Sequence, residues 1–289
     1  MKRSLLPVLT GLGLCLAQIS AHAQDYKEHI SKQFTVQGAA SGTTLAIYNI
    51  FGSITVQGYS GSQVTIEIDE TIRGKEQSDV EQGKKEVKLG FDQKADSIIA
   101  YTAEPYNSRP HRNWNRDENN ERRIHYTVKL EYTVKVPYGM NLCVSTVNEG
   151  NVEVKDVYGA LKVNNVNGGI TIANAKGTTN AHTINGPLKV TYLTIPPDAS
   201  NYYTLNGKLE VTYPANLAAD LEFKSMNGQF YTDFPDTEIL PTRVNKTESK
   251  SGAGTTYKLS KNNGVRIGAG GKLFKFETLN GNIYIKKQQ

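Results

Sequence analysis

The side chains best suited to chemistry in this chain form two basic groups. The first lies in the polar segment 104–123, where Arg112 and Arg116 flank Trp114, the single tryptophan. An indole ring between guanidinium groups can hold a sugar ring or an anionic partner. A solvated hairpin tip accounts for the same composition, so this segment has two interpretations.

The second basic group lies at the end of the chain. Residues 241–289 contain ten Lys and Arg against two Glu, a local net charge of +8. We select Lys272, Lys275 and Lys286 as candidate ligand contacts, because clustered cations concentrate polyanions. The partners that this charge favours are an anionic glycan, lipid head groups or another envelope protein. Solvated lysines on strand faces are the alternative. No nucleic acid is expected, since the chain has no recognisable nucleic-acid-reading module.

The residue types that enzymes use are present but not in catalytic patterns. Glu153, Asp156, Asp198 and Glu210 do not recur at matched repeat positions, as acid–base or calcium sites on a repeat would require. The histidines after residue 23 lack metal-ligand spacing: His29, His111, His125 and His182. Ser60 misses the spacing of a serine nucleophile elbow, and the glycines at 268–271 precede a strand pattern, whereas a phosphate loop precedes a helix. We therefore predict no catalytic residues, no metal site and no cofactor.

The first residues predict export. Lys2 and Arg3 precede an apolar stretch, and Ala21 and Ala23 provide the small residues that a signal peptidase reads, so cleavage is expected before Gln24. The apolar stretch is shorter than the roughly 20 residues of a membrane-spanning helix, and no later segment approaches that length. We expect an exported protein without a transmembrane segment, in the periplasm or on the outer surface of a bacterium. Lipidation at Cys15 is the alternative; the large Leu14 before it argues against that signal.

The mature chain would retain Cys143 alone, so no intramolecular disulfide is expected. The apolar neighbours Leu142 and Val144 predict that Cys143 is a small core residue.

A glycine repeat gives the strongest structural signal. Glycines recur at intervals of nine, and most are followed two and four positions later by apolar residues, which is typical of a short strand: Gly150, Gly159, Gly168, Gly177 and Gly186. Every second turn is Asn-Gly or a variant, so one coil leads from Gly150 to Gly168, an offset of 18 in numbering, and a later one from Gly186 to Gly207, an offset of 21. This predicts an all-β fold, a parallel β-solenoid with two strands per coil. A series of hairpins is the alternative. We attribute the Asn-Gly corners to positive φ angles.

The longer offset also aligns three aromatic residues. Tyr192, Tyr213 and Phe234 should stack, either as part of the core or as an exposed sugar-binding ladder.

The repeat predicts three parts in the chain. Residues 1–23 are the signal peptide, 24–44 an N-terminal lead-in, and 45–289 a single solenoid with an insertion at about 67–136. The insertion should contain a short helix from Ser78 to about Leu89 and an inserted hairpin of two strands. We expect residues 236–260 to be a polar connection, followed by two more coils at Asn263-Gly264 and Asn280-Gly281.

Three segments carry a resemblance to a known family. Val134-Lys-Val-Pro137, Val211-Thr-Tyr-Pro214-Ala and the run from Gly268 to Ile285 resemble, in their order, the bacterial putative-adhesin domain family of unknown function. The resemblance implies an adhesin-like β-solenoid at the cell envelope and offers no catalytic residues. We expect a non-catalytic exported interaction or scaffold protein. The alternative is a glycan-active enzyme, a polysaccharide lyase or hydrolase on a β-helix, whose site the motifs do not reveal.

Overall fold

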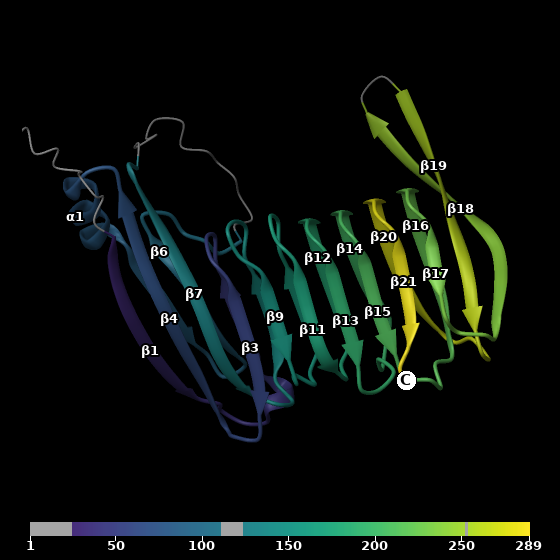
Figure 1. The fold of residues 1–289 in the computed structure, drawn as a ribbon, viewed down its shortest axis with the longest axis horizontal. Helices are drawn as coiled ribbons and strands as arrows, with labels where there is room; N and C mark the ends of the chain where they lie inside the picture. Colours follow the sequence, from purple (N-terminus) through teal and green to yellow (C-terminus); the bar gives the residue numbers. More distant parts are fainter. Residues whose placement is uncertain (1–24, 111–123, 252–253) are drawn as a thin grey trace, which may run out of the picture.

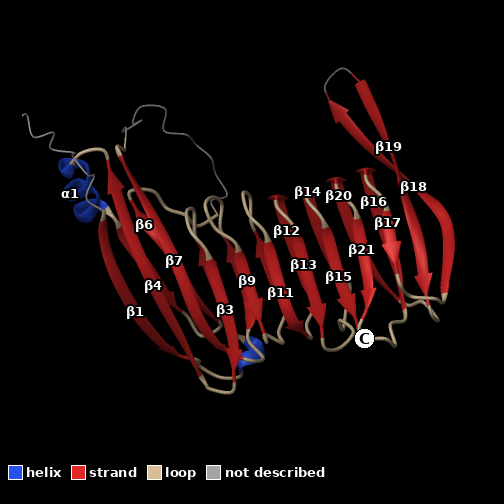
Figure 2. Ribbon diagram, in the orientation of Figure 1, coloured by secondary structure: helices blue, strands red, loops and turns tan. Residues whose placement is uncertain are grey.

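The chain forms two mixed β-sheets that enclose one hydrophobic core (Figures 1 and 2). The computed structural model describes residues 25–110, 124–251 and 254–289, and the side chains of residues 243–262 are outside that description. The expectation of an all-β chain is confirmed, and the two sheets do not close into a barrel.

The strands of the two sheets are as follows. The first sheet has the order β1 (Tyr26–Thr35), β4 (Gln63–Gly74), β7 (Tyr126–Pro137), β3 (Ile54–Tyr59), β9 (Val152–Lys155), β11 (Ile170–Ala175), β13 (Leu188–Tyr192), β15 (Leu209–Tyr213), β21 (Ile283–Lys287) and β17 (Phe230–Thr232). The second sheet has the order β18 (Thr237–Ser251), β19 (Gly254–Ile267), β16 (Ala219–Asn227), β20 (Lys272–Asn280), β14 (Ser200–Asn206), β12 (Thr179–Asn185), β10 (Leu161–Asn164), β8 (Asn141–Ser145), β2 (Thr44–Tyr48), β6 (Ser97–Glu104) and β5 (Lys88–Gln93).

The central strands pair in parallel and in the register that the repeat predicts. Leu188 pairs with Ile170 of the preceding coil and with Leu209 of the following one. The apolar side chains of these strands point between the sheets, because alternate residues of a strand face opposite sides. Seven residues that the repeat places in one core are at most 2% exposed, as predicted: Val154, Val163, Ile172, Leu188, Val190, Leu209 and Val211.

The Asn-Gly corners form an asparagine column and a glycine column along this stack. Each asparagine after the first donates its side-chain amide to the side-chain oxygen of the asparagine before it in the stack, at 2.7–2.8 Å, in the order Asn148, Asn167, Asn185, Asn206, Asn280 and Asn227. The attribution of positive φ to the asparagines and glycines of these corners was wrong, because none of them has a positive φ; in the variant Asn148-Glu149-Gly150, it is Glu149 that does. A Cβ on Gly207 would instead lie 2.1 Å from the carbonyl oxygen of Gly186. Glycine is required there by the close approach of neighbouring coils.

The terminal coils are not stacked in sequence order. The last coil of the chain, β20 and β21, lies between the coil β14–β15 and the coil β16–β17. Likewise, β2 and β3 lie between β6–β7 and β8–β9. The aromatic ladder therefore differs from the prediction. Tyr192 stacks on Tyr213 in the core, and Tyr213 stacks on Phe274 at 5.5 Å; Phe234 is separated from Tyr213 by β21.

The N-terminal insertion contains the predicted helix and strands, but not the predicted hairpin. The two strands expected to form it, β6 and β7, belong to different sheets, and β6 pairs antiparallel with β5 instead. The α-helix α1 spans Gln77–Glu86, and its N-cap is Glu76, whose backbone N–H donates to Asp79. The prediction that the helix begins at Ser78 was therefore wrong. The helix also ends before the predicted limit near Leu89, because β5 already begins at Lys88. A 3-10 turn, Ala40–Gly42, precedes β2, while the lead-in forms β1, which pairs antiparallel with β4.

The C-terminal interruption is also more ordered than predicted. The segment expected as a polar connection forms β18 and the first half of β19, a long antiparallel hairpin. Asn263-Gly264 lies within β19, which pairs antiparallel with β16, so it is not a corner of a further coil. The sequence of residues 236–260 is mainly polar and lacks the apolar alternation typical of the other strands, which explains why the sequence pattern missed it.

Candidate binding face

The outward face of the second sheet carries a row of polar and aromatic side chains, one from each strand. Strand pairing places them in register, and they are defined here as the outer row: Tyr101, Tyr48, Ser145, Asn164, His182 and Tyr203. Each neighbour in the row is about 4.8 Å from the next, the spacing of paired strands. Beyond Tyr203, the same register continues with Glu277 and Lys224, which form an ion pair with each other. The row thus provides regularly spaced hydroxyl, amide and ring groups, which suit a repetitive, extended ligand.

The rings of the outer row have defined contacts. The His182 and Tyr203 rings have centroids 4.4 Å apart, and burial lowers the pKa of His182, so its imidazole is neutral near pH 7. The Tyr48 hydroxyl lies 3.9 Å from the Cys143 thiol, and burial raises the pKa of Tyr48 to about 12. Cys143 is half-buried beside this row and is not in the core, because its neighbours Leu142 and Val144 take the inward positions.

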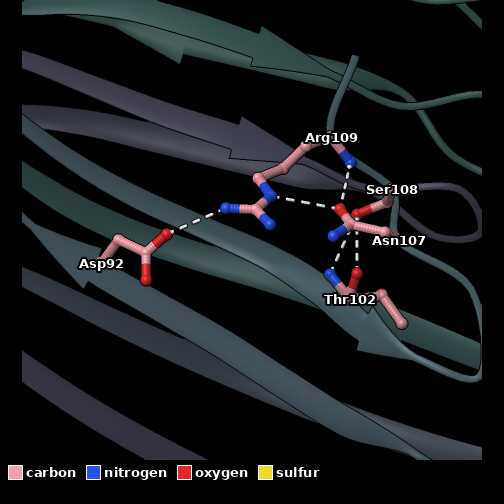
Figure 3. A network of polar contacts seen from close by, with 5 residues as sticks. All are labelled: Asp92, Thr102, Asn107, Ser108 and Arg109. Atoms are coloured by element: carbon pink, nitrogen blue, oxygen red, sulfur yellow. Dashed lines mark hydrogen bonds and ion pairs between the residues drawn. The ribbon is translucent and has the colours of Figure 1, made fainter. Parts of the chain in front are cut away.

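The start of segment 104–123 is held in place by polar contacts of Asn107, Ser108 and Arg109 with one another and with Thr102 and Asp92 (Figure 3). The Ser108 hydroxyl donates to the Tyr48 carbonyl at 2.7 Å and accepts the Thr102 backbone N–H at 2.9 Å. The Arg109 guanidinium pairs with Asp92 at 3.1 Å and lies over the Tyr101 ring at 4.0 Å. A cation is therefore held against the first ring of the row and covers it. The candidate residues Arg112, Trp114 and Arg116 follow within a few positions but lie outside the described residues.

Two exposed lysines lie on the same face, in the row of outward residues next to the outer row. This neighbouring row contains Lys162 of β10, Asn180 of β12, Asn201 of β14 and Lys275 of β20, in that order. Lys162 and Lys275 are three strand spacings apart, roughly 14 Å. The structure thus places the predicted Lys275 on one face with Arg109, and adds Lys162.

The other two predicted lysines are elsewhere. Lys272 begins β20, and its ammonium group donates to the Pro196 carbonyl at 3.5 Å. Lys286 lies on the opposite face of the molecule, on the first sheet, where it forms an ion pair with Glu210 at 3.0 Å. Burial opposes ionisation of Glu210, but the ammonium groups of Lys208 and Lys286 lower its pKa overall. Lys272, Lys275 and Lys286 therefore do not form one cluster.

Carboxylates gather at the N-terminal edge of the first sheet. His29 lies 2.7 Å from Asp69 and 3.0 Å from Glu67, and these hydrogen bonds raise its pKa, the Asp69 bond most strongly. Glu70 is only 6% exposed, and burial raises its pKa to about 7. The alternation of β4 directs Asp69 outward and Glu70 inward, so the sheet separates them and they do not form an acid–base pair.

Metal-binding clusters and membrane-spanning helices are both absent from the part of the chain that the structure describes. Within residues 25–110, 124–251 and 254–289, no three His, Cys, Asp or Glu side chains are grouped closely enough to hold a metal ion. Across the same residues, no helix has the length and apolar character to cross a bilayer.

Sequence reasoning missed the outer row although its signal was available. The offsets that align the core residues also align Asn164, His182 and Tyr203, one position after the apolar residues. The sequence could not add Tyr48 and Tyr101 to the row, because their strands, β2 and β6, are not stacked in sequence order.

Comparison with known proteins gives distant structural matches. No protein-family model matches the chain, and no curated protein matches it. A structure described as a "putative cell adhesion protein" from Clostridium sporogenes is similar over 91% of this chain and 100% of its own, with 11% identity and a TM-score of 0.46. A "putative adhesin" from Bacteroides fragilis is similar over 90% of this chain and 97% of its own, with 12% identity and a TM-score of 0.36.

Proposed function

We propose that this chain is an exported, non-catalytic interaction protein of the bacterial cell envelope, built as a β-solenoid, that binds an acidic glycan along the outward face of its second sheet. The observation that carries the proposal is the alignment of the outer row with cations on one face. Arg109 is held over Tyr101, while the exposed Lys162 and Lys275 flank the row further along.

The chemistry of the face suits a charged polysaccharide. Hydroxyl and amide groups such as those of Ser145 and Asn164 exchange hydrogen bonds with sugar hydroxyls, and the ring faces of Tyr and His provide apolar contact. The lysines attract carboxylate or sulfate groups and raise the local concentration of the polymer. A repetitive polymer also meets equivalent groups at each strand, so weak contacts add along its length.

A glycan-active enzyme is the weaker alternative. Such an enzyme needs two carboxylates facing a common sugar, one with a raised pKa. Glu70 has the raised pKa, but it points between the sheets while Asp69 points outward. The carboxylate on the same side as Glu70 is Glu28 of β1, whose charge adds to the effect of burial on the pKa of Glu70, so an enzyme at this edge would have to use Glu28 and Glu70, away from the cations of the binding face.

The proposal is tested by titrating the mature protein with polygalacturonate and, as a neutral counterpart, dextran. We expect polygalacturonate to bind with an affinity that falls steeply as salt rises, because the attraction is screened once the Debye length reaches about 8 Å. Lys162→Glu with Lys275→Glu should weaken binding about tenfold or more. Tyr203→Ala should also weaken it, and Trp114→Ala should do so if segment 104–123 takes part.

Lys155→Glu is the matched control. Lys155 is an exposed residue of β9 on the opposite face, and its partners in the neighbouring strands, Gln57 and Ala173, are uncharged. One charge reversal there should leave the affinity unchanged, whereas Lys162→Glu alone should weaken binding. An equal loss in the control would refute binding at the second sheet, and dextran binding that ignores salt would refute the electrostatic account.

Export is tested separately by sequencing the N-terminus of the protein from an envelope fraction. Gln24 should be the first residue, and recovery of the chain with Met1 or with a lipidated Cys15 at its start would contradict cleavage at this position.

A further inference from the structure

The two sheets end at different places at the two ends of the molecule (Figure 1). At the C-terminal end, the first sheet stops at β17, whereas β19 and β18 continue the second sheet beyond β16. At the N-terminal end, the second sheet gains only β5 beyond β6, whereas the first sheet gains both β4 and β1 beyond β7. Each end therefore has an overhang, and the two overhangs belong to opposite sheets.

The C-terminal overhang, formed by β19 and β18, leaves apolar inner surface uncovered. Ile239 pairs with Val265, whose buried side chain faces the core, so Ile239 has the same orientation, yet it is 86% exposed. Next to it, the stacked rings of Phe223 and Phe230, 4.0 Å apart, line a cavity of about 430 Å³ together with Ile239 and Val265. Among the described residues, the first sheet has no strand beyond β17, so none lies opposite β19 and the outer edge of β17 is unpaired in the sheet.

The N-terminal overhang, formed by β1, carries apolar side chains on its inner face. Ile30 and Phe34 pair with the buried Ile68 and Val64, so their side chains face inward. Both remain half-buried: the Phe34 ring lies 6.2 Å from that of Phe91 in β5, and the described residues of the second sheet form no strand beyond β5. The outer edge of β1 is likewise unpaired in the sheet.

The two ends carry opposite net charge. Residues 24–104, which include β1, β4 and β5, contain 12 acidic and 8 basic residues, a net charge of −4. Residues 237–267, which include β18 and β19, contain six basic and two acidic residues, a net charge of +4. Charge complementarity favours contact between an N-terminal and a C-terminal end, and like charge disfavours contact between two ends of the same kind.

We propose that copies of this chain associate head to tail. In this arrangement, β1 of one copy lies beside β17 of the next, continues its first sheet, and covers Ile239 and Phe230 with its inward apolar side chains. The inner face of β19 and β18 in one copy then lies against the inner face of β1 in the next copy. Because the contact joins different surfaces of identical chains, it extends into a filament unless the rotation between copies closes a ring. This inference does not depend on the glycan proposal.

The test is sedimentation velocity of the mature protein over a wide concentration range at low salt. The average mass should rise past that of a dimer, and raising the salt should reduce it. Ile239→Glu should weaken association at least tenfold without affecting folding, since this side chain is exposed. Leu193→Glu is the matched control, because Leu193 is 41% exposed but lies in the middle of the stack, and it should associate like the parent.

Hydrogen exchange at low and high concentration identifies the surfaces in contact. Head-to-tail association predicts new amide protection in both β1 and the β17–β18 region. A protein that stays monomeric throughout, association that stops at a dimer with protection at one end only, or Ile239→Glu behaving like the control would each overturn the proposal.

Discussion

Replacing Gly207 with alanine tests whether close approach of the coils explains the Asn-Gly corners. The new Cβ would lie 2.1 Å from the Gly186 carbonyl oxygen, well inside the 3.4 Å at which ordinary contact begins. The coils cannot separate freely, because strand pairing holds them about 4.8 Å apart. Moving the corner far enough to relieve the overlap would break its nearest hydrogen bonds, Gly186 N–H to Asn206 O at 3.1 Å and the Asn206 amide to Asn185 at 2.8 Å.

The magnitude follows from those contacts. Two lost hydrogen bonds cost about 1 kcal/mol each, and residual overpacking adds at least about 1 kcal/mol. We expect Gly207→Ala to lower the free energy of unfolding by about 3 kcal/mol, and Tm by roughly 6–12 °C at about 2–4 °C per kcal/mol. Urea unfolding and differential scanning calorimetry provide the measurements.

Gly42→Ala is the control for the glycine substitution itself. A Cβ on Gly42 meets no atom within 4 Å, and its φ is not positive. Its stability should be unchanged or higher by up to about 1 kcal/mol, because alanine restricts the unfolded chain. If Gly207→Ala is as stable as Gly42→Ala, steric contact between neighbouring coils is not the reason for the glycine column.

Two further predictions concern buried groups. Val190→Asp places a carboxylate in a position that is 0% exposed, and it should destabilise the protein by at least about 4 kcal/mol or prevent folding; a melting temperature within a degree or two of the parent would disprove the burial. The pKa of Glu70 is raised from 4.5 to about 7 in the folded protein, so folding favours the protonated carboxyl group. The stability that this protonation confers is complete below about pH 4.5 and is lost as the pH rises towards 7. As the pH rises from 4.5 to 8, the free energy of unfolding of Glu70→Gln, measured by urea titration, should therefore increase by up to about 3 kcal/mol relative to that of the parent. The titration of His29 is common to both proteins and cancels in this comparison. If the difference between the two proteins does not change with pH, Glu70 is ionised in the folded protein at no cost.

The sequence by itself determined the central stack. The two repeat offsets identify which positions pair, because each coil must place its apolar residues over those of the last. The buried positions from Val154 to Val211 follow from that pattern alone. The same periodicity would have located Asn164, His182 and Tyr203, since a strand that buries one face exposes the other.

Only the tertiary structure decided the ends of the stack and the composition of the binding face. Sequence order suggests that consecutive repeats are neighbours, but β20–β21 pairs between two earlier coils and β2–β3 pairs between two later ones. A repeat pattern records which residues face inward and gives no information on which edge a coil joins, because all coils offer the same backbone hydrogen bonds. For that reason Lys275 lies on one face with Arg109, Lys286 is held by Glu210 on the other, and Ile239 remains uncovered where the first sheet ends.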